Sequence, residues 1–256
     1  MTDIAVTTED YVSIVEMQRP PHNFFDLDLL RAIADALAEL EADTACRAVV
    51  LAAEGKSFCA GADLTSPSRS VLSGARPAAA SVYEQGVRIF RFAKPMVAAV
   101  HGAAIGGGLG LAMTADFRIA CPEARLSANF TKLGFHPGFG LSVSLPRVIG
   151  VQAASMMLLT SRRMGGEEAA RIGLVDQLVA QGDVRASAVA LATEIAGNAP
   201  LAVRSTRATQ RGRLADDVEQ MLRHELEEQL ELRNTDDYRE GVAAMSERRP
   251  PNFTET

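Results

Sequence analysis

The sequence contains few cysteines and no pattern of metal ligands. Its three cysteines, Cys46, Cys59 and Cys121, are widely spaced, and no Cys-x-x-Cys pair or Cys/His cluster occurs. Closely spaced cysteine pairs are the signature of zinc sites, and ordered sets of cysteines are the signature of disulfide frameworks. We therefore expect neither, and we interpret the three cysteines as small buried apolar residues.

Long apolar runs and an excess of positive charge are also missing. Gly, Lys or Arg interrupts every apolar stretch short of the roughly 20 residues that a membrane span needs. The first ten residues carry acids and lack the basic-then-apolar order of a secretion signal. The formal net charge is −6, whereas nucleic-acid binding requires clustered Lys and Arg. These absences predict a cytoplasmic protein whose partner is neither a membrane nor a nucleic acid.

What is present is an alternation of strand and helix patterns along 256 residues, 47% of them hydrophobic. Asp26 is placed to cap a helix over residues 27–43, with Leu29, Ile33 and Leu37 on its apolar face. Alternation of this kind is typical of an α/β fold. The predicted strands cover residues 11–17, 47–52, 96–100 and 116–120, and further helices are predicted at 81–93 and 109–115.

From residue 158 onward the pattern is mostly helical. The last long helix, 216–233, has many acids and a narrow apolar stripe that includes Met221, Leu222 and Leu226. A narrow stripe indicates packing against another element or another subunit. The helices predicted here cover residues 166–172, 184–198, 200–212 and 216–233.

Two short segments of small residues carry the functional signal. Gly106-Gly107-Gly108 lies where a buried strand ends and a helix begins, and Cys59–Leu64 follows another strand. Glycine lets backbone N–H groups approach a ligand closely beside the positive end of a helix. One N–H from each segment could converge on an oxygen and form an oxyanion hole, which stabilises a thioester carbonyl as it becomes an enolate. A close-packed turn without a ligand remains the alternative.

A dinucleotide-binding oxidoreductase was considered and set aside. The run that begins at Gly108 and Gly110 has Met113 where a third glycine belongs. No acidic residue follows about 20 residues later to bind a ribose.

Together the two segments resemble the crotonase (enoyl-CoA hydratase/isomerase) superfamily. The resemblance rests on residues 60–64 (Ala-Gly-Ala-Asp-Leu), on residues 94–108 from Lys-Pro to the triple glycine, and on residues 115–120. It continues through residues 145–150, 169–176 and 240–242, so that it spans nearly the whole chain.

The resemblance implies a fold, a ligand and site residues. It implies an α/β crotonase-like spiral of ββα turns over residues 1–195, and a helical oligomerisation region over 196–256 that builds homotrimers or dimers of trimers. The ligand would be an acyl-CoA thioester, with coenzyme A as part of the substrate and no metal or redox cofactor. The backbone N–H groups of Ala62 and Gly107 would form the oxyanion hole. Residues that would contact the CoA ester are Ala60, Asp63, Leu64 and Gly106.

The same resemblance indicates unusual chemistry. Family hydratases carry a glutamate at the position of Gly110 and a second at the position of Phe130, and some isomerases carry a carboxylate at the position of Gly138. Adding water across a conjugated double bond needs a base and an acid, and neither glycine nor phenylalanine can serve. We therefore predict weak or absent hydratase activity.

Other residues could supply the missing acid or base. His136, on the loop that carries the second glutamate in relatives, is the main candidate because histidine titrates near neutrality. Tyr83 and Glu84 are further polar groups that could reach the acyl pocket. Residues 130, 135 and 139 are all phenylalanine, which favours an apolar acyl group. The alternative function is a non-catalytic acyl-CoA binding protein.

Overall fold

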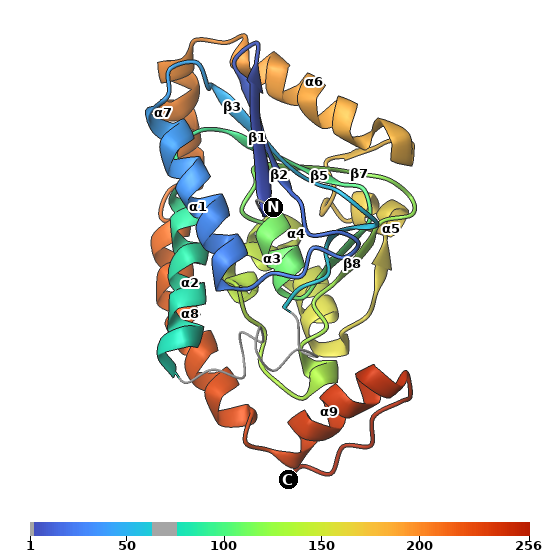
Figure 1. Ribbon diagram of the computed structural model, residues 1–256. Helices are drawn as coiled ribbons and strands as arrows, with labels where there is room; N and C mark the ends of the chain where they lie inside the picture. Colours follow the sequence, from blue (N-terminus) through green and yellow to red (C-terminus); the bar gives the residue numbers. More distant parts are fainter. Residues whose placement is uncertain (1–2, 63–75) are drawn as a thin grey trace.

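The computed structural model describes residues 3–62 and 76–256, which form two β-sheets flanked by helices (Figure 1). The larger sheet has six strands in the order β1-β2-β3-β5-β7-β10. Only β1 is antiparallel to its neighbour, and the other pairs are parallel. The predicted α/β fold class is confirmed. The strands are β1 (Ile4–Glu9), β2 (Val12–Met17), β3 (Ala48–Ala53), β5 (Met96–Val100), β7 (Phe117–Ala120) and β10 (Gln177–Leu178).

The smaller sheet takes its strands from the same passages of chain. It comprises β4 (Ser57–Cys59), β6 (Ala103–Ile105), β8 (Arg125–Ser127) and β9 (Met164–Gly165). Three times a strand of the large sheet is followed by one of the small sheet: β3 by β4, β5 by β6, and β7 by β8. Through these three turns the strands β3, β5 and β7 pair in parallel, and so do β4, β6 and β8, so the chain advances as a spiral and brings equivalent strand ends to the same edge.

Helices cover the sheets, and their packing follows the sequence pattern. In α1 (Leu27–Ala42), Asp26 caps the first turn by accepting the Leu29 N–H at 3.0 Å, as predicted. Its apolar face, Leu29 to Leu40, is buried. Helices α1, α2 (Arg76–Arg91) and α8 (Leu214–Leu232) stand side by side (Figure 1). The shorter helices are α3 (Gly107–Ala112), α5 (Gly166–Arg171), α6 (Val184–Ala196) and the 3-10 turns Thr131–Leu133 and Gln181–Asp183.

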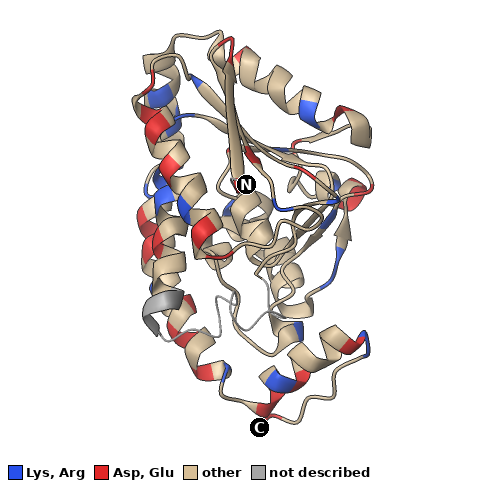
Figure 2. Ribbon diagram, in the orientation of Figure 1, with Lys and Arg blue, Asp and Glu red and all other residues tan. Residues whose placement is uncertain are grey.

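Most charged side chains of α8 lie on its exposed side, and its buried side carries Glu225 and Gln229 beside apolar residues. Figure 2 shows acidic and basic residues along α1, α2, α8 and α9 (Asp236–Glu247), with few on the strands between them. The narrow apolar stripe of α8 includes Val218, Leu222 and Leu226, all buried in this chain, and α8 packs on α2 and α4. Its partner is therefore found within the chain.

The sequence patterns missed three features. The predicted strand over residues 11–17 is confirmed as β2, but β1 before it was missed; the two form a hairpin, because Asp10 and Tyr11 turn the chain with φ of 46° and 67°. Helix α4 (Leu141–Thr160) was not predicted, since Pro146 lies inside it and Gly150 kinks it with φ 77° and ψ 158°. Helix α9 was not predicted either.

Among the described helices, α4 alone has the length and apolar composition of a membrane span. The kink at Gly150 divides it, and its buried residues, such as Leu141 and Leu145, pack inside the protein. Several other apolar residues of α4 are exposed: Val148, Val151, Met156 and Leu159.

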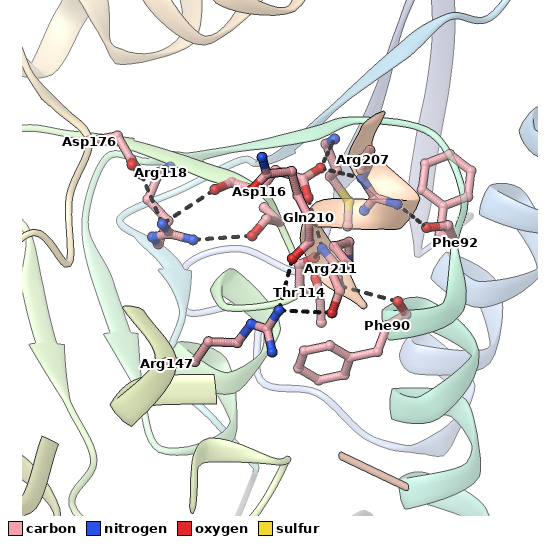
Figure 3. Close-up of polar contacts among 12 residues, drawn as sticks. Phe90, Phe92, Thr114, Asp116, Arg118, Arg147, Asp176, Arg207, Gln210 and Arg211 are labelled. Carbon is pink, nitrogen blue, oxygen red and sulfur yellow. Dashed lines mark hydrogen bonds and ion pairs between the residues drawn. The ribbon is translucent and has the colours of Figure 1, made fainter. Parts of the chain in front are cut away.

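A part-buried ion-pair network fastens α7 (Pro200–Arg211) to the large sheet (Figure 3). Asp116 accepts the Met96 N–H at 2.9 Å, and its two oxygens pair with Arg207 at 2.7 Å and Arg211 at 2.9 Å. Both guanidinium groups also donate to backbone carbonyls at the end of α2. Asp116 therefore braces the start of two strands and the C-terminal helices together.

Candidate functional site

A cavity of about 910 Å³ opens beside the small sheet. This volume lies in the range typical of small-molecule and cofactor sites. Its walls come from segments as distant as Phe24 and Pro251. The predicted site positions Ala60, Ala62, Gly106 and Gly107 all line it, whereas Asp63 and Leu64 lie outside the described residues.

The two small-residue segments meet in this wall because the strands before them are paired. In the parallel pair β4 and β6, Ser57 lies opposite Ala103 and Cys59 opposite Ala104. Both strands then end at the same edge. Gly61 has φ 91°, and a Cβ atom placed on it would lie 2.8 Å from the Ile105 carbonyl oxygen and 3.9 Å from the Gly107 nitrogen. Only glycine allows this approach of the two backbones.

Some backbone N–H groups of the two small-residue segments already donate hydrogen bonds within the protein, and others do not. The Ala60 N–H donates to the His22 carbonyl at 3.0 Å, and the Gly106 N–H donates to the Ser127 carbonyl at 2.8 Å. Within the part of the chain that the structure describes, the N–H groups of Ala62 and Gly107 donate to no backbone carbonyl. Gly107 is the first residue of α3, where helix N–H groups have no partner inside the helix. These two donors belong to wall residues and are available to a ligand.

Aromatic rings fill the space around the donors. Phe25 and Phe139 lie with ring centroids 5.6 Å apart, and Phe130 and Phe135 lie 5.4 Å apart. All four line the cavity. A Cβ atom placed on Gly110 would lie 2.6 Å from the Phe139 Cβ, so Phe139 occupies the space that a side chain at 110 would need. The inner wall is therefore apolar.

One polar pair interrupts this apolar wall. The Tyr83 hydroxyl donates to Gln229 Oε1 at 2.6 Å, and Gln229 Nε2 donates to the His136 carbonyl at 2.8 Å. Both side chains line the cavity next to Gly138. A Cβ on Gly138 would lie 2.5 Å from Gln229 Nε2 and 2.7 Å from the Tyr83 oxygen. The pair thus occupies the room that a side chain at position 138 would take.

A buried carboxylate fixes the loop behind the pair. Glu225 is fully buried and accepts the N–H of Gly140 at 2.8 Å and that of Ser142 at 3.1 Å. Glu225 therefore accepts hydrogen bonds from N–H groups at the start of α4, which have no partner within the helix. Burial raises the pKa of Glu225 to about 7, against the opposing effect of these hydrogen bonds. Glu225 holds in place the loop that carries Gly138 and Phe139.

Five cations of the described chain also line the cavity. Arg162 pairs with Glu168 and Arg249 with Glu240. The remaining three, Lys132, Arg163 and Arg248, have no carboxylate partner among the described residues. No aspartate or glutamate occurs among the described wall residues. The cavity thus suits a ligand with a negatively charged end.

Comparison with known proteins identifies the family. The model of the family described as enoyl-CoA hydratase/isomerase matches residues 7–256. The chain belongs to the enoyl-CoA hydratase/isomerase family. A putative enoyl-CoA hydratase of Thermus thermophilus is 36% identical over 247 residues, which cover 95% of this chain and 97% of that protein. The short-chain-enoyl-CoA hydratase of Clostridium acetobutylicum is 33% identical over 97% of this chain and 96% of its own length.

Solved structures confirm the crotonase fold. An enoyl-CoA hydratase/isomerase from Pseudoalteromonas atlantica superposes with a TM-score of 0.87 at 30% identity, covering 98% of this chain and all (100%) of that one. EchA1_1 from Mycobacterium paratuberculosis also gives a TM-score of 0.87, at 28% identity and 100% coverage of both chains. The predicted spiral of ββα turns is therefore the family fold.

The site places His136 differently from the prediction. Its Nδ1 lies 2.8 Å from the Pro137 carbonyl, and its ring lies 5.6 Å from that of His224, on the side of α8. His136 is not among the described residues of the cavity wall, and neither is the exposed Glu84. Of the polar residues that the sequence proposed for the acyl pocket, Tyr83 reaches the cavity. Its partner there is Gln229 of α8, which sequence reasoning missed.

Proposed function

We propose that this enoyl-CoA hydratase/isomerase family protein binds an acyl-CoA thioester and stabilises its enolate with the N–H groups of Ala62 and Gly107. The observation that supports this most directly is the meeting of two family segments, each with an available N–H donor, in the wall of one apolar cavity. In such a dry site one oxyanion donor typically contributes about 2.7–4 kcal/mol of transition-state stabilisation.

We further propose that ordinary hydratase activity is weak. Hydration needs carboxylates that activate water and deliver a proton to the α-carbon. Here position 110 is a glycine beneath Phe139, position 130 is a phenylalanine, and the described wall carries no carboxylate. Enolate chemistry with a non-standard acid or base, such as isomerisation, decarboxylation or carbon–carbon cleavage, fits this wall better than hydration.

The mixed wall of the cavity supports an acyl-CoA ligand. Lys132, Arg163 and Arg248 provide positive charge for the phosphates of coenzyme A. The aromatic rings of the same wall favour a bulky or hydrophobic acyl group. No further cofactor is needed for this chemistry.

We propose that the protein acts as a homotrimer or a dimer of trimers. Val151 and Leu159 on α4 are 71% and 76% exposed, and Val148 and Met156 lie on the same helix. Apolar side chains gathered on one helix commonly mark a protein–protein contact. Light scattering on the purified protein would give the mass of the assembly, and a monomer would contradict this proposal.

The function is tested with a panel of acyl- and enoyl-CoA esters. Binding is followed by calorimetry, and conversion is followed by mass spectrometry on the same samples. We expect micromolar or tighter binding of several esters and little hydration of crotonyl-CoA. Crotonyl-CoA hydration at ordinary hydratase rates would overturn the proposal of weak hydratase activity, and no binding of any ester would overturn the acyl-CoA assignment.

The second candidate function is a non-catalytic acyl-CoA binding protein, favoured by the lack of a carboxylate among the described wall residues. Deuterium uptake at the α-carbon of a bound ester in D₂O distinguishes the two, because only an enolising enzyme promotes this exchange. His136→Ala adds a further comparison: loss of turnover with unchanged affinity would restore a catalytic role for His136 despite its position outside the wall.

A further inference from the structure

Tyr83 presents an unusual hydrogen-bonding surface to the cavity. Its neighbours Gln229 and Gly138 also line the cavity, and the absence of a side chain at Gly138 lets the phenol and the amide reach it. The aromatic rings of Phe25, Phe130, Phe135 and Phe139 line the same cavity. The donor and acceptor pattern of this pair is fixed by its surroundings.

The direction of each hydrogen bond follows from one backbone carbonyl. The His136 carbonyl can only accept, so the group of Gln229 that lies 2.8 Å from it is the NH₂. The amide oxygen of Gln229 therefore faces Tyr83 at 2.6 Å, and the phenol must donate its one proton to it. The Tyr83 oxygen then keeps its lone pairs and has no proton left to give.

Ionisation does not disturb this pattern. Burial, with a smaller contribution from the charge of Glu225, raises the pKa of Tyr83 well above its ordinary value near 10. The phenol therefore stays protonated at neutral pH. A ligand meets a neutral acceptor, whose proton is already committed to Gln229.

We propose that Tyr83 is a specificity-determining residue that accepts a hydrogen bond from a hydroxyl group on the acyl chain. The hydroxyl group of a hydroxylated ester can donate a hydrogen bond to the Tyr83 oxygen. An oxo group cannot donate, so its oxygen and the Tyr83 oxygen would be two acceptors without a shared proton. A cationic donor is disfavoured because the described wall carries Lys132 and four arginines (Arg162, Arg163, Arg248 and Arg249) and no carboxylate. This inference rests on the proposed binding of acyl-CoA esters and narrows it to hydroxyacyl esters.

The test compares affinities for matched esters. Calorimetry would measure binding of straight-chain acyl-CoA esters, each paired with hydroxy and oxo derivatives of the same length, with the substituent at C3 or further along. We expect the wild-type protein to bind at least one hydroxy ester about tenfold more tightly than its parent, as one net hydrogen bond predicts. Tyr83→Phe should remove that preference, so that a hydroxy ester and its parent bind this variant with equal affinity.

Two further variants make the test specific. Gln229→Leu frees the phenol proton, so this variant should bind oxo esters better than the wild-type protein does. Tyr238→Phe is the matched control, because Tyr238 packs on Phe135 outside the described cavity wall, and it should keep the wild-type preference.

The outcomes separate this inference from the function on which it rests. Equal affinity for every parent and hydroxy ester, or a hydroxyl preference that persists in Tyr83→Phe, would overturn the role of Tyr83 and leave acyl-CoA binding intact. Failure of the wild-type protein to bind any ester would overturn the proposed function itself.

Discussion

The packing of Phe139 on Gly110 gives the sharpest test of the site geometry. In Gly110→Ala the new Cβ would lie 2.6 Å from the Phe139 Cβ and 2.8 Å from its Cδ1, where contacts of about 3.5–4.0 Å are normal. The Phe139 loop cannot yield easily, since Glu225 holds the next residue, Gly140. Overpacking of this kind costs about 1–3 kcal/mol. The higher helix propensity of alanine inside α3 stabilises the protein by up to about 1 kcal/mol. We therefore expect Gly110→Ala to lower the free energy of unfolding by roughly 1–2 kcal/mol.

Phe139→Gly provides the matched background. It removes the ring and the Cβ together, and it suits the φ of 58° at this position. Alone it should cost about 3–4 kcal/mol, which is the loss of a buried ring less the relieved backbone strain. In that background Gly110→Ala meets no clash, so it should become neutral or stabilise the protein by up to about 1 kcal/mol.

The wild-type protein, the two single variants and the double variant form a double-mutant cycle. Equilibrium urea unfolding, followed by circular dichroism, measures the stability of all four proteins. The slopes should stay equal, so that midpoints report stability directly. A coupling energy of roughly 1–3 kcal/mol is expected. If Gly110→Ala destabilises both backgrounds equally, Phe139 does not fill the space at position 110, and the packing account of this glycine is refuted.

Three further predictions concern charge. Folding raises the pKa of Glu225 from 4.5 to about 7, so the folded state binds this proton more tightly and stability should fall by about 3 kcal/mol as pH rises through that window. Unfolding of Glu225→Gln at pH 5 and 7.5 should lack this contribution, and parallel curves for both proteins would contradict it. Asp116→Ala leaves the part-buried guanidinium groups of Arg207 and Arg211 without their carboxylate, which should cost about 1–3 kcal/mol and lower the melting temperature. An unchanged melting temperature would refute a bracing role. Arg163→Gln should weaken coenzyme A binding in calorimetry and make it less salt-dependent, whereas an unaltered salt response would remove Arg163 from the phosphate site.

The sequence was sufficient where a feature depends on local spacing. The Asp26 cap and the apolar face of α1 follow from residues a few positions apart, and both are confirmed. The segments at Gly61 and Gly107 were also predictable, because each follows its strand directly and glycine marks where backbone must approach closely. Both segments lie in the cavity wall.

Sequence reasoning failed where distance along the chain is large or a rule has an exception. Tyr83 and Gln229 are 146 residues apart, and no periodicity relates them. Helix α4 was hidden by Pro146 and Gly150, which normally end a helix and here only bend it. Glu225 belongs to a helix with the composition of a solvated surface, yet it turns inward to the start of α4. Tertiary packing decides each of these cases.

The wide span of the cavity wall, from Phe24 to Pro251, has a consequence for biosynthesis. The ribosome must release nearly the whole chain before the binding site can close, so a nascent or truncated product cannot recruit the ligand. A bound ester at one hundred times its dissociation constant would add about 2.7 kcal/mol to the stability of the finished protein alone. Supply of the thioester would then set the lifetime of complete chains against proteolysis and leave incomplete chains unprotected.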